Sequence, residues 1–368
     1  MPEIIGFDGH VLTGRFQGTR TTLSNLLIAL AKRIGDKEVI VYTDDPQAAK
    51  ELLDVSRYRY KPLGGAGSIR RLLSAFPKLF KRDGVTIGVF QYMTPLWGRN
   101  VVFIHDILPI THPHLFPLTM RLRTKLFFSL AIWRSELVFV VSNYTKSEIQ
   151  RIYGIGDNRL KVVRNGPSFP LSAYSSETTD DTVGSSGERF ILTVGRIEPR
   201  KNIPLLVDAF RKSGVTDVRL IIVGAFDLGF KFRVPAGVKV EIKAGVSEFD
   251  LIRLYKTASL FIFPSEAEGF GVPLLDATLF GLPVISSNKT AMPEVGLDLV
   301  EYFDPTAPDA VDTLARQIEG HFGERPISRP SREMRVAQAA RFSWDRAAES
   351  FVSAIEQIIE TGAKHRRH

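Results

Sequence analysis

Cysteine is absent from this chain of 368 residues. The absence excludes disulfide bridges, thiolate zinc sites, iron–sulfur clusters and a cysteine nucleophile. It is typical of proteins of the reducing cytoplasm, where we expect this protein to be. No apolar run in the sequence approaches the about 20 residues that a membrane-spanning helix needs. The first residues include Glu3 and Asp8 and lack the basic start of a signal peptide, so we expect none.

Common metal and nucleotide motifs are also missing. His112 and His114 flank a proline, which places them in an expected loop, and Asp44-Asp45 and Asp180-Asp181 fall in an expected turn and linker. The segment Gly64-Gly65-Ala66-Gly67 lacks the third glycine of a dinucleotide fingerprint, and no P-loop pattern occurs. We therefore expect no metal ion and no cofactor.

Basic residues outnumber acidic residues by 48 to 40, which gives a formal net charge of +8. Such a balance favours anionic partners, such as phosphorylated ligands, lipid headgroups or nucleic acid. Nucleic acid is not an expected partner, because no recognition module accompanies the charge. Apolar residues make up 44% of the chain, which indicates globular domains rather than disorder.

Short apolar runs alternate with segments of helical spacing along most of the chain. Such runs are typical of strands buried in a parallel sheet. Residues 169–187 are polar and aperiodic, which indicates a linker. We therefore expect an α/β protein with two doubly wound parallel sheets, in residues 1–168 and 188–344, that face each other across a ligand-binding cleft. A last helix at residues 345–362 is expected to pack back on the first domain.

Local patterns define the individual elements. Helices are expected at Thr22–Arg33, Ile203–Lys212, Glu248–Lys256 and Trp344–Glu360, and a capping box at Thr145-x-x-Glu148 predicts another helix after Val141. The expected strands are Glu3–Phe7, Glu38–Tyr42, Val85–Phe90, Asn100–Ile104, Glu136–Val141, Arg159–Arg164, Arg189–Gly195, Val218–Gly224, Val238–Ile242, Ala258–Phe263 and Pro283–Ser286.

The first motif with chemical content is the loop 195–201, between a predicted strand and a predicted helix. Arg196 and Lys201 are placed to project from this loop toward a ligand. Two fixed cations suit a diphosphate, which carries at least two negative charges and leaves with them. The alternative is that both are ordinary solvated surface charges.

The second motif follows the predicted strand that ends at Phe263. Gly269 and Gly271 bracket Phe270 in a turn, and Pro273 occupies the first turn of the next helix, where its missing N–H costs nothing. The backbone N–H groups around Gly271–Leu274 can bind a phosphate at the positive end of the helix dipole.

Two carboxylates belong to this second motif. Seven residues separate Glu268, before the turn, from Asp276, inside the helix. One carboxylate can accept hydrogen bonds from a sugar and the other from a ribose, because both are polyols. The alternative for Asp276 is a solvated helix carboxylate.

These two motifs occur together with His105-Asp106-Ile107, Gly281-Leu282-Pro283-Val284 and Met292-Pro293-Glu294-Val295. The combination resembles the retaining glycosyltransferases of family 4, also called group 1, which have the GT-B fold of two Rossmann-like domains. The resemblance extends over nearly the whole chain. It implies that the N-terminal domain binds the acceptor and that the C-terminal domain binds a nucleotide-sugar donor.

The resemblance implies a role for each matching residue. Arg196 and Lys201 would bind the donor pyrophosphate, and Glu268 would bind hydroxyls of the donor sugar. Asp276 would bind the ribose, where the family usually has glutamate. His105 would lie near the sugar and the acceptor, whereas a lone histidine is more often a buried structural residue. The donor site would be completed by Gly269, Phe270, Gly271, Val272, Pro273 and Leu274.

The N-terminal loop departs from the family pattern. Relatives have a Gly-x-Gly-type turn over the donor phosphate, and this chain has the single glycine Gly18. We expect its N–H to approach the phosphate.

The pattern His105-Asp106-Ile107-Leu108-Pro109, followed by His112-Pro113, resembles mannosyltransferases of surface-polysaccharide assembly. The resemblance implies transfer of mannose from GDP-mannose to a glycan or lipid-linked acceptor, without a metal ion. A UDP-sugar donor, a GT-B nucleotide-sugar epimerase or hydrolase, and a silent nucleotide-sugar binder are the alternatives. An epimerase would need a second acid/base pair, which we do not find, and a silent binder would not need Arg196, Lys201 and Glu268 together.

Two basic amphipathic segments, Ser68–Arg82 and Leu118–Arg134, lie in the N-terminal half. Such segments can lie on an anionic membrane, which would place the protein at the inner face of the cytoplasmic membrane. The alternative is that each is an ordinary helix with its apolar side in the core.

Overall fold

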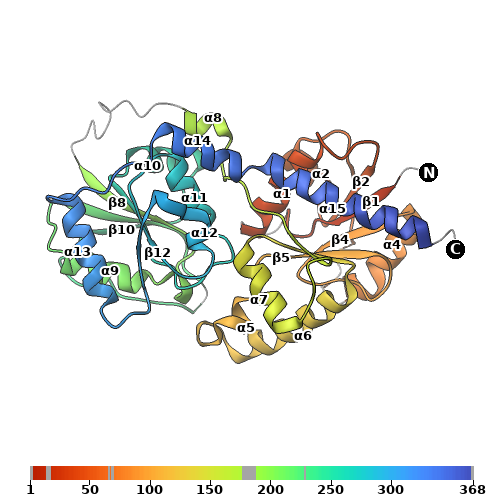
Figure 1. The fold of residues 1–368 in the computed structure, drawn as a ribbon, viewed down its shortest axis with the longest axis horizontal. Coiled ribbons are helices and arrows are strands. Elements are labelled where there is room, and N and C mark those ends of the chain that lie inside the picture. Colours follow the sequence, from red (N-terminus) through yellow and green to blue (C-terminus); the bar gives the residue numbers. More distant parts are fainter. Residues whose placement is uncertain are drawn as a thin grey trace. The chain divides into compact units, whose positions relative to one another are not determined.

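The computed structural model describes residues 3–13, 18–64, 67, 70–175, 188–227 and 229–365. The chain divides into two units: unit 1 comprises Met1–Gly166 and Phe342–His368, and unit 2 comprises Pro167–Arg341. Each unit is a parallel sheet covered by helices (Figure 1). The expected boundary after residue 168 and the observed division after Gly166 are therefore close together.

Unit 1 contains a seven-stranded sheet in the order β3-β2-β1-β4-β5-β6-β7, with every neighbouring pair parallel in the described residues. The strands are β1 (Ile4–Asp8), β2 (Glu38–Thr43), β3 (Arg59–Pro62), β4 (Ile87–Gln91), β5 (Asn100–Ile104), β6 (Leu137–Val140) and β7 (Leu160–Val162). The helices are α1 (Gly18–Leu30), α2 (Pro46–Leu53), the π-helical turn η1 (Arg71–Ala75), α4 (Phe76–Asp83), α5 (Leu108–Thr111), the 3-10 turn η2 (Pro113–Leu115), α6 (Leu118–Arg134) and α7 (Asn143–Tyr153).

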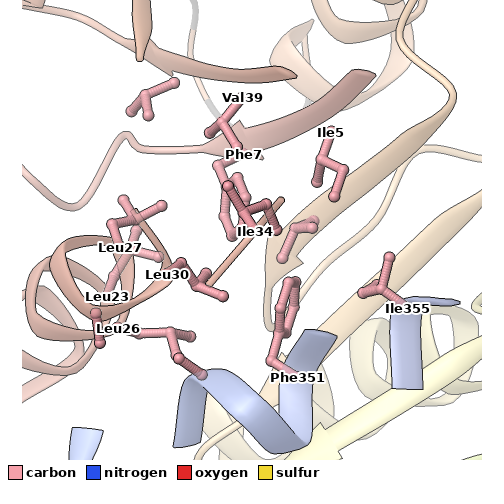
Figure 2. Close-up of a cluster of buried hydrophobic side chains, with 14 of the residues drawn as sticks. Ile5, Phe7, Leu23, Leu26, Leu27, Leu30, Ile34, Val39, Phe351 and Ile355 are labelled. Carbon is pink, nitrogen blue, oxygen red and sulfur yellow. The ribbon is translucent and has the colours of Figure 1, made fainter. Parts of the chain in front are cut away.

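The last helix, α15 (Trp344–His365), belongs to unit 1 although it follows unit 2 in sequence. It packs along α1, and Phe351 is buried among the rings of Phe7, Phe103 and Phe139. Figure 2 shows Phe351 and Ile355 beside the leucines of α1 and the side chains of β1. The helix expected to pack on the N-terminal domain thus covers one face of its sheet together with α1.

Unit 2 contains a six-stranded parallel sheet in the order β10-β9-β8-β11-β12-β13. The strands are β8 (Arg189–Val194), β9 (Val218–Val223), β10 (Val240–Lys243), β11 (Leu260–Phe263), β12 (Val284–Ser287) and β13 (Glu301–Phe303). The helices are α8 (Leu171–Ser175), η4 (Pro199–Lys201), α9 (Ile203–Lys212), α10 (Glu248–Thr257), α11 (Val272–Leu279), α12 (Met292–Gly296), η5 (Leu297–Leu299), α13 (Ala310–Phe322) and α14 (Arg332–Arg341).

Three sequence expectations need correction. Part of the expected linker is packed structure, because Phe169 and Tyr174 are buried against Phe280 and Tyr255 of unit 2; residues 176–187 lie outside the described residues. The cap of α7 is Ser142, whose hydroxyl accepts from the N–H of Thr145, so the N-cap lies three residues before the expected one at Thr145.

Two strands at the sheet edges, β3 (Arg59–Pro62) and β13 (Glu301–Phe303), were not expected from the sequence. Both lie at an edge, and both have exposed positions in place of a buried apolar run. Edge strands of this kind lack the signal by which central parallel strands are recognised.

In the described part of the first basic segment, residues 70–82, the apolar side of the helix packs into the core of unit 1. Leu72 and Phe76 are buried, and Phe80 packs beside them in a cluster with Tyr42 and Phe90. This side therefore offers no continuous apolar face to a membrane. In the described residues no helix is both long enough and apolar enough to cross a bilayer.

Candidate active site in unit 2

The topology of unit 2 places the two motifs side by side. Strand order reverses between β8 and β11, which are neighbours in the sheet. Loop 195–201 follows β8, and Glu268 follows β11. Loops at the carboxyl ends of two such strands form the ligand-binding crevice of doubly wound sheets. Residues that are 67 positions apart in sequence therefore meet here.

The centre of this site is a buried cluster of one carboxylate and two cations. Lys201 Nζ donates to Glu268 Oε1 at 2.5 Å, and Arg200 Nη1 donates to Glu268 Oε2 at 2.6 Å. A second guanidinium nitrogen of Arg200 pairs with Glu198 at 2.6 Å. The Lys201 ammonium also lies 5.0 Å from the centre of the Phe263 ring. Both oxygens of Glu268 are thus fixed by cations.

Charge and burial compete in this cluster. Burial by itself raises the pKa of Glu268, but Arg200 and Lys201 outweigh it and hold that pKa at about 2. Burial lowers the pKa of Lys201, with Arg200 adding to the effect and Glu268 opposing it. Glu268 is therefore an anion at neutral pH, able to accept hydrogen bonds and poorly suited to donate a proton.

The backbone around the cluster is closely packed. Gly195 has a φ of +149°, and a Cβ at this position would lie 3.2 Å from Nζ of Lys201. A Cβ on Gly224 would lie 1.9 Å from the carbonyl oxygen of Gly195. Any larger side chain at residue 224 would therefore displace the loop that carries Arg196 and Lys201.

Arg196 is separate from the buried cluster. It is 42% exposed and pairs with Asp227 at 3.2 Å. Asp227 also lines a hollow of about 720 Å³ together with Phe226, Phe230 and Phe232. Arg196 is thus held at the surface by an exposed ion pair, a weak interaction that an anionic ligand can replace.

The start of α11 has fewer free backbone N–H donors than expected from the sequence. Gly271 is the N-cap with a φ of +96°, and Leu274 donates its N–H to the carbonyl of Gly271 at 3.0 Å. Pro273 has no N–H. Of Gly271–Leu274, only Gly271 and Val272 are therefore candidates for phosphate binding. Gly269 and Phe270 are buried in the turn before them.

Asp276 lies inside unit 2 and has protein partners. Its Oδ1 accepts hydrogen bonds from the Ser168 N–H at 2.9 Å and from the Tyr174 hydroxyl at 2.6 Å. Burial raises the pKa of Asp276 to about 6. No described bond joins it to Lys201 or Glu268. Its carboxylate joins Ser168 and Tyr174 to α11. The expected contact with a ribose stays a prediction.

His105 follows β5 in unit 1 and is buried beside the rings of Tyr92 and Phe103. Its Nε2 lies 2.6 Å from Oε1 of Gln91, at the end of the neighbouring strand β4. Because an amide oxygen only accepts, Nε2 donates, and Nδ1 is left as an acceptor. Burial lowers the pKa of His105 to about 4, so the ring is neutral at neutral pH.

The low pKa of His105 predicts a pH dependence of stability. The unfolded chain, with a histidine pKa near 6.5, binds the proton before the native state does, so stability falls as pH decreases from about 6.5 to about 4. Between pH 7 and pH 5 the loss is about 2 kcal/mol. Urea unfolding followed by tryptophan fluorescence at both pH values measures it. His105→Gln should lose this part of the pH dependence, and an unchanged dependence would contradict a buried neutral ring.

Gly18 is the first residue of α1 and is exposed. A Cβ added to Gly18 would meet nothing within 4 Å, so the packing of unit 1 does not require glycine there. The residues just before it lie outside the described ranges. Across the described residues, no group of three His, Asp or Glu side chains could hold a metal ion.

Sequence reasoning missed three contributors: Arg200, Gln91 and Tyr174. Arg200 had a local signal, because it is adjacent to Lys201 in the same loop. Gln91 and Tyr174 had none, because their contacts with His105 and Asp276 depend on strand pairing and helix packing.

Two family models match successive parts of this chain. The family model "Glycosyl transferases group 1" matches residues 176–321, and "Glycosyltransferase Family 4" matches residues 16–167. The O-antigen chain mannosyltransferase B of Escherichia coli is 27% identical over 75% of this chain and 75% of its own length. The serotype-specific mannosyltransferase WbdA of Escherichia coli is 26% identical over 76% of this chain, which corresponds to 36% of that longer protein.

A solved structure shows the same fold. Anabaena Alr3699/HepE, in complex with UDP and glucose, superimposes with a TM-score of 0.64 at 20% identity, over 99% of this chain and 100% of that one. Together with the two parallel-sheet units, this likeness establishes the GT-B fold. The chain therefore belongs to the group 1 glycosyltransferases of the family 4 type.

Proposed function

We propose that this protein transfers a hexosyl group, mannose from GDP-mannose, to a hydroxyl of a glycan or lipid-linked acceptor, with retention of the anomeric configuration. The observation that carries the proposal is the cluster of Lys201, Arg200 and Glu268 at the point where strand order reverses in unit 2. The mannose assignment is supported by the names of two relatives, an O-antigen chain mannosyltransferase and a serotype-specific mannosyltransferase.

In the reaction, the bond between the anomeric carbon of the sugar and the diphosphate oxygen breaks. A bond between the same carbon and the acceptor oxygen forms. The acceptor proton goes to a phosphate oxygen of the donor, so no side-chain base is required. Negative charge grows on the departing diphosphate, and cations placed there before the reaction stabilise the transition state more than the ground state.

In unit 2, different residues bind the diphosphate and the sugar of the donor. Lys201 and Arg196 bind the diphosphate, and the N–H groups of Gly271 and Val272 add hydrogen bonds at the positive end of α11. Glu268, held as an anion by Arg200, accepts hydrogen bonds from the sugar hydroxyls. These groups neutralise the charge of the departing diphosphate, and the proposed mechanism requires no metal ion.

Unit 1 supplies the acceptor side in this proposal. Gly18, at the start of α1, contributes its N–H to the donor phosphate. His105 contacts the sugar or the acceptor as a neutral ring, with Nδ1 as hydrogen-bond acceptor. The proposal includes peripheral association with the inner face of the cytoplasmic membrane, where a lipid-linked acceptor would lie.

The test is calorimetric titration with GDP, UDP, ADP and TDP, followed by their sugar conjugates. Preferential binding of GDP and GDP-mannose supports the proposal. Preferential binding of UDP keeps the transferase and replaces the donor, a result that the UDP complex of Anabaena Alr3699/HepE makes worth testing. Binding by none of the four nucleotides would overturn it.

A turnover measurement separates the transferase from an epimerase or a hydrolase. The selected donor is incubated with and without a glycan acceptor. A transferase releases nucleoside diphosphate much faster when acceptor is present. An epimerase or hydrolase consumes the donor at the same rate without acceptor, and a silent binder does not consume it at all.

A further inference from the structure

Helix α6 has two opposite faces of different character. One face is buried, through Thr124, Phe128, Ala131 and Ile132. The other exposes Leu118, Leu122, Leu126, Leu130 and Trp133, with exposed fractions of 60, 61, 57, 40 and 74%. At 3.6 residues per turn, the spacing of four, four, four and three residues puts these side chains in one stripe along the helix. Single exposed apolar residues are ordinary, but a continuous stripe marks an interaction surface.

Positive charge borders this stripe on both sides. Helical periodicity places Lys125 on one side and Arg123 and Arg134 on the other. Arg123 and Lys125 are exposed, and α6 contains no Asp or Glu. The second basic segment thus combines an outward apolar stripe with cationic borders, which the described residues of the first segment do not.

The C-terminal end of α6 is held firmly against unit 1. Arg159 donates to the carbonyls of Ile132 and Ser135 at 2.6 and 2.7 Å. Arg134 donates to the carbonyls of Leu96 and Gly98 in the loop before β5. In that loop Leu96 is 40% exposed and Trp97 is 59% exposed. The apolar surface therefore continues beyond Trp133 onto a second, fixed segment.

We propose that α6 docks on the surface of a bilayer that contains anionic lipid, with the stripe Leu118, Leu122, Leu126, Leu130 and Trp133 buried at the headgroup boundary. An interfacial helix of this kind has an apolar face, basic borders and tryptophan at the level of the headgroups. Arg123, Lys125 and Arg134 then lie at the depth of the lipid phosphates, which attract them.

Charge favours lipid over a second copy of the chain. Two α6 helices packed on each other would bring together like charges, with no acidic residue on either helix to pair with them. A bilayer with anionic headgroups supplies the opposite charge along the whole helix. The inference deepens the peripheral association proposed above, but lipid binding requires neither donor nor acceptor, so it can fail or succeed independently of the transferase.

The experiment measures sedimentation of the full chain with vesicles of phosphatidylcholine containing 30% phosphatidylglycerol, and with vesicles of phosphatidylcholine alone. We expect binding to the anionic vesicles and a blue shift of the emission of Trp97 and Trp133 as they enter the headgroup region. Leu122→Glu/Leu126→Glu should weaken binding more than tenfold. Arg123→Gln/Lys125→Gln should weaken binding to anionic vesicles and leave the weak binding to neutral vesicles unchanged.

Two matched control variants make the same changes of charge at surface positions outside α6. Phe249→Glu/Val336→Glu replaces exposed apolar residues of α10 and α14 in unit 2, which are 76 and 61% exposed. Lys78→Gln/Lys81→Gln removes two exposed charges of α4. Both should bind vesicles as the unchanged chain does. Equal losses in the controls would show diffuse charge attraction and overturn the proposal.

The oligomeric state distinguishes a bilayer from a second copy of the chain as the partner of the stripe. Light scattering of the unchanged chain and of Leu122→Glu/Leu126→Glu is expected to give the same mass. A dimer that the double variant dissociates, with vesicle binding unaffected, would assign the stripe to a second copy and overturn the proposal. Absence of binding to anionic vesicles by the unchanged chain would overturn it directly.

Discussion

Lys201→Ala is expected to lower kcat/KM for the donor selected by the binding experiment by about 100-fold to 1000-fold. Fixed groups directed at growing negative charge have effects of this size when one is removed. The ammonium of Lys201 is buried and fixed by Glu268 at 2.5 Å and by the ring of Phe263. It therefore needs no rearrangement as charge develops on the diphosphate, so its loss should affect kcat more than KM.

A loss of folding must be separated from a loss of chemistry in this variant. Removing Lys201 leaves Glu268 with Arg200 as its remaining described ion-pair partner, and breaking a buried ion pair costs about 3–5 kcal/mol. Unfolding midpoints and the Kd for the nucleoside diphosphate are measured on the same preparation. The control is Arg211→Ala, an exposed residue of α9 whose partner is Asp208 in the same helix. Turnover of Lys201→Ala within threefold of the unchanged protein would remove Lys201 from the proposed site.

Phe351→Ala is expected to destabilise unit 1 by about 3–5 kcal/mol, the usual cost of truncating a buried phenylalanine. Phe351 is fully buried, and its ring centre lies 5.8, 6.0 and 5.1 Å from those of Phe7, Phe103 and Phe139. The smaller side chain leaves a cavity between α15 and the strands β1, β5 and β6. The variant should also release α15 from α1, because the two helices share this core.

The tryptophans make this prediction measurable in one unit alone. The chain has three, and Trp97, Trp133 and Trp344 all belong to unit 1. Urea unfolding followed by tryptophan fluorescence therefore reports unit 1 without unit 2. Leu122→Ala, on an exposed side chain of α6 in unit 1, should change stability by no more than about 0.5 kcal/mol. A change below about 1 kcal/mol in Phe351→Ala would mean that α15 is not part of the folding core of unit 1.

The central strands and the loops that carry the site can be recognised from composition and order along the chain. Runs such as 101–104 and 260–263 are buried on both sides of a parallel sheet and must be apolar throughout, so composition alone identifies them. The turn with Gly271 and the loop with Lys201 follow such runs directly. Their position at the carboxyl ends of strands, and hence their place in the site, could be predicted from order along the chain.

Which side chains those loops bring together depends on the packing of elements that are distant along the chain. The pairing of Arg200 with Glu268, of Gln91 with His105 and of Tyr174 with Asp276 joins residues that are far apart in sequence. No local pattern specifies these contacts, because each depends on strand order and helix packing. The same reason applies to α6. Its amphipathic sequence does not say which of its apolar residues lie in the core, and only the packing of Phe128 and Ile132 within unit 1 reveals that the stripe through Leu122 and Trp133 faces outward.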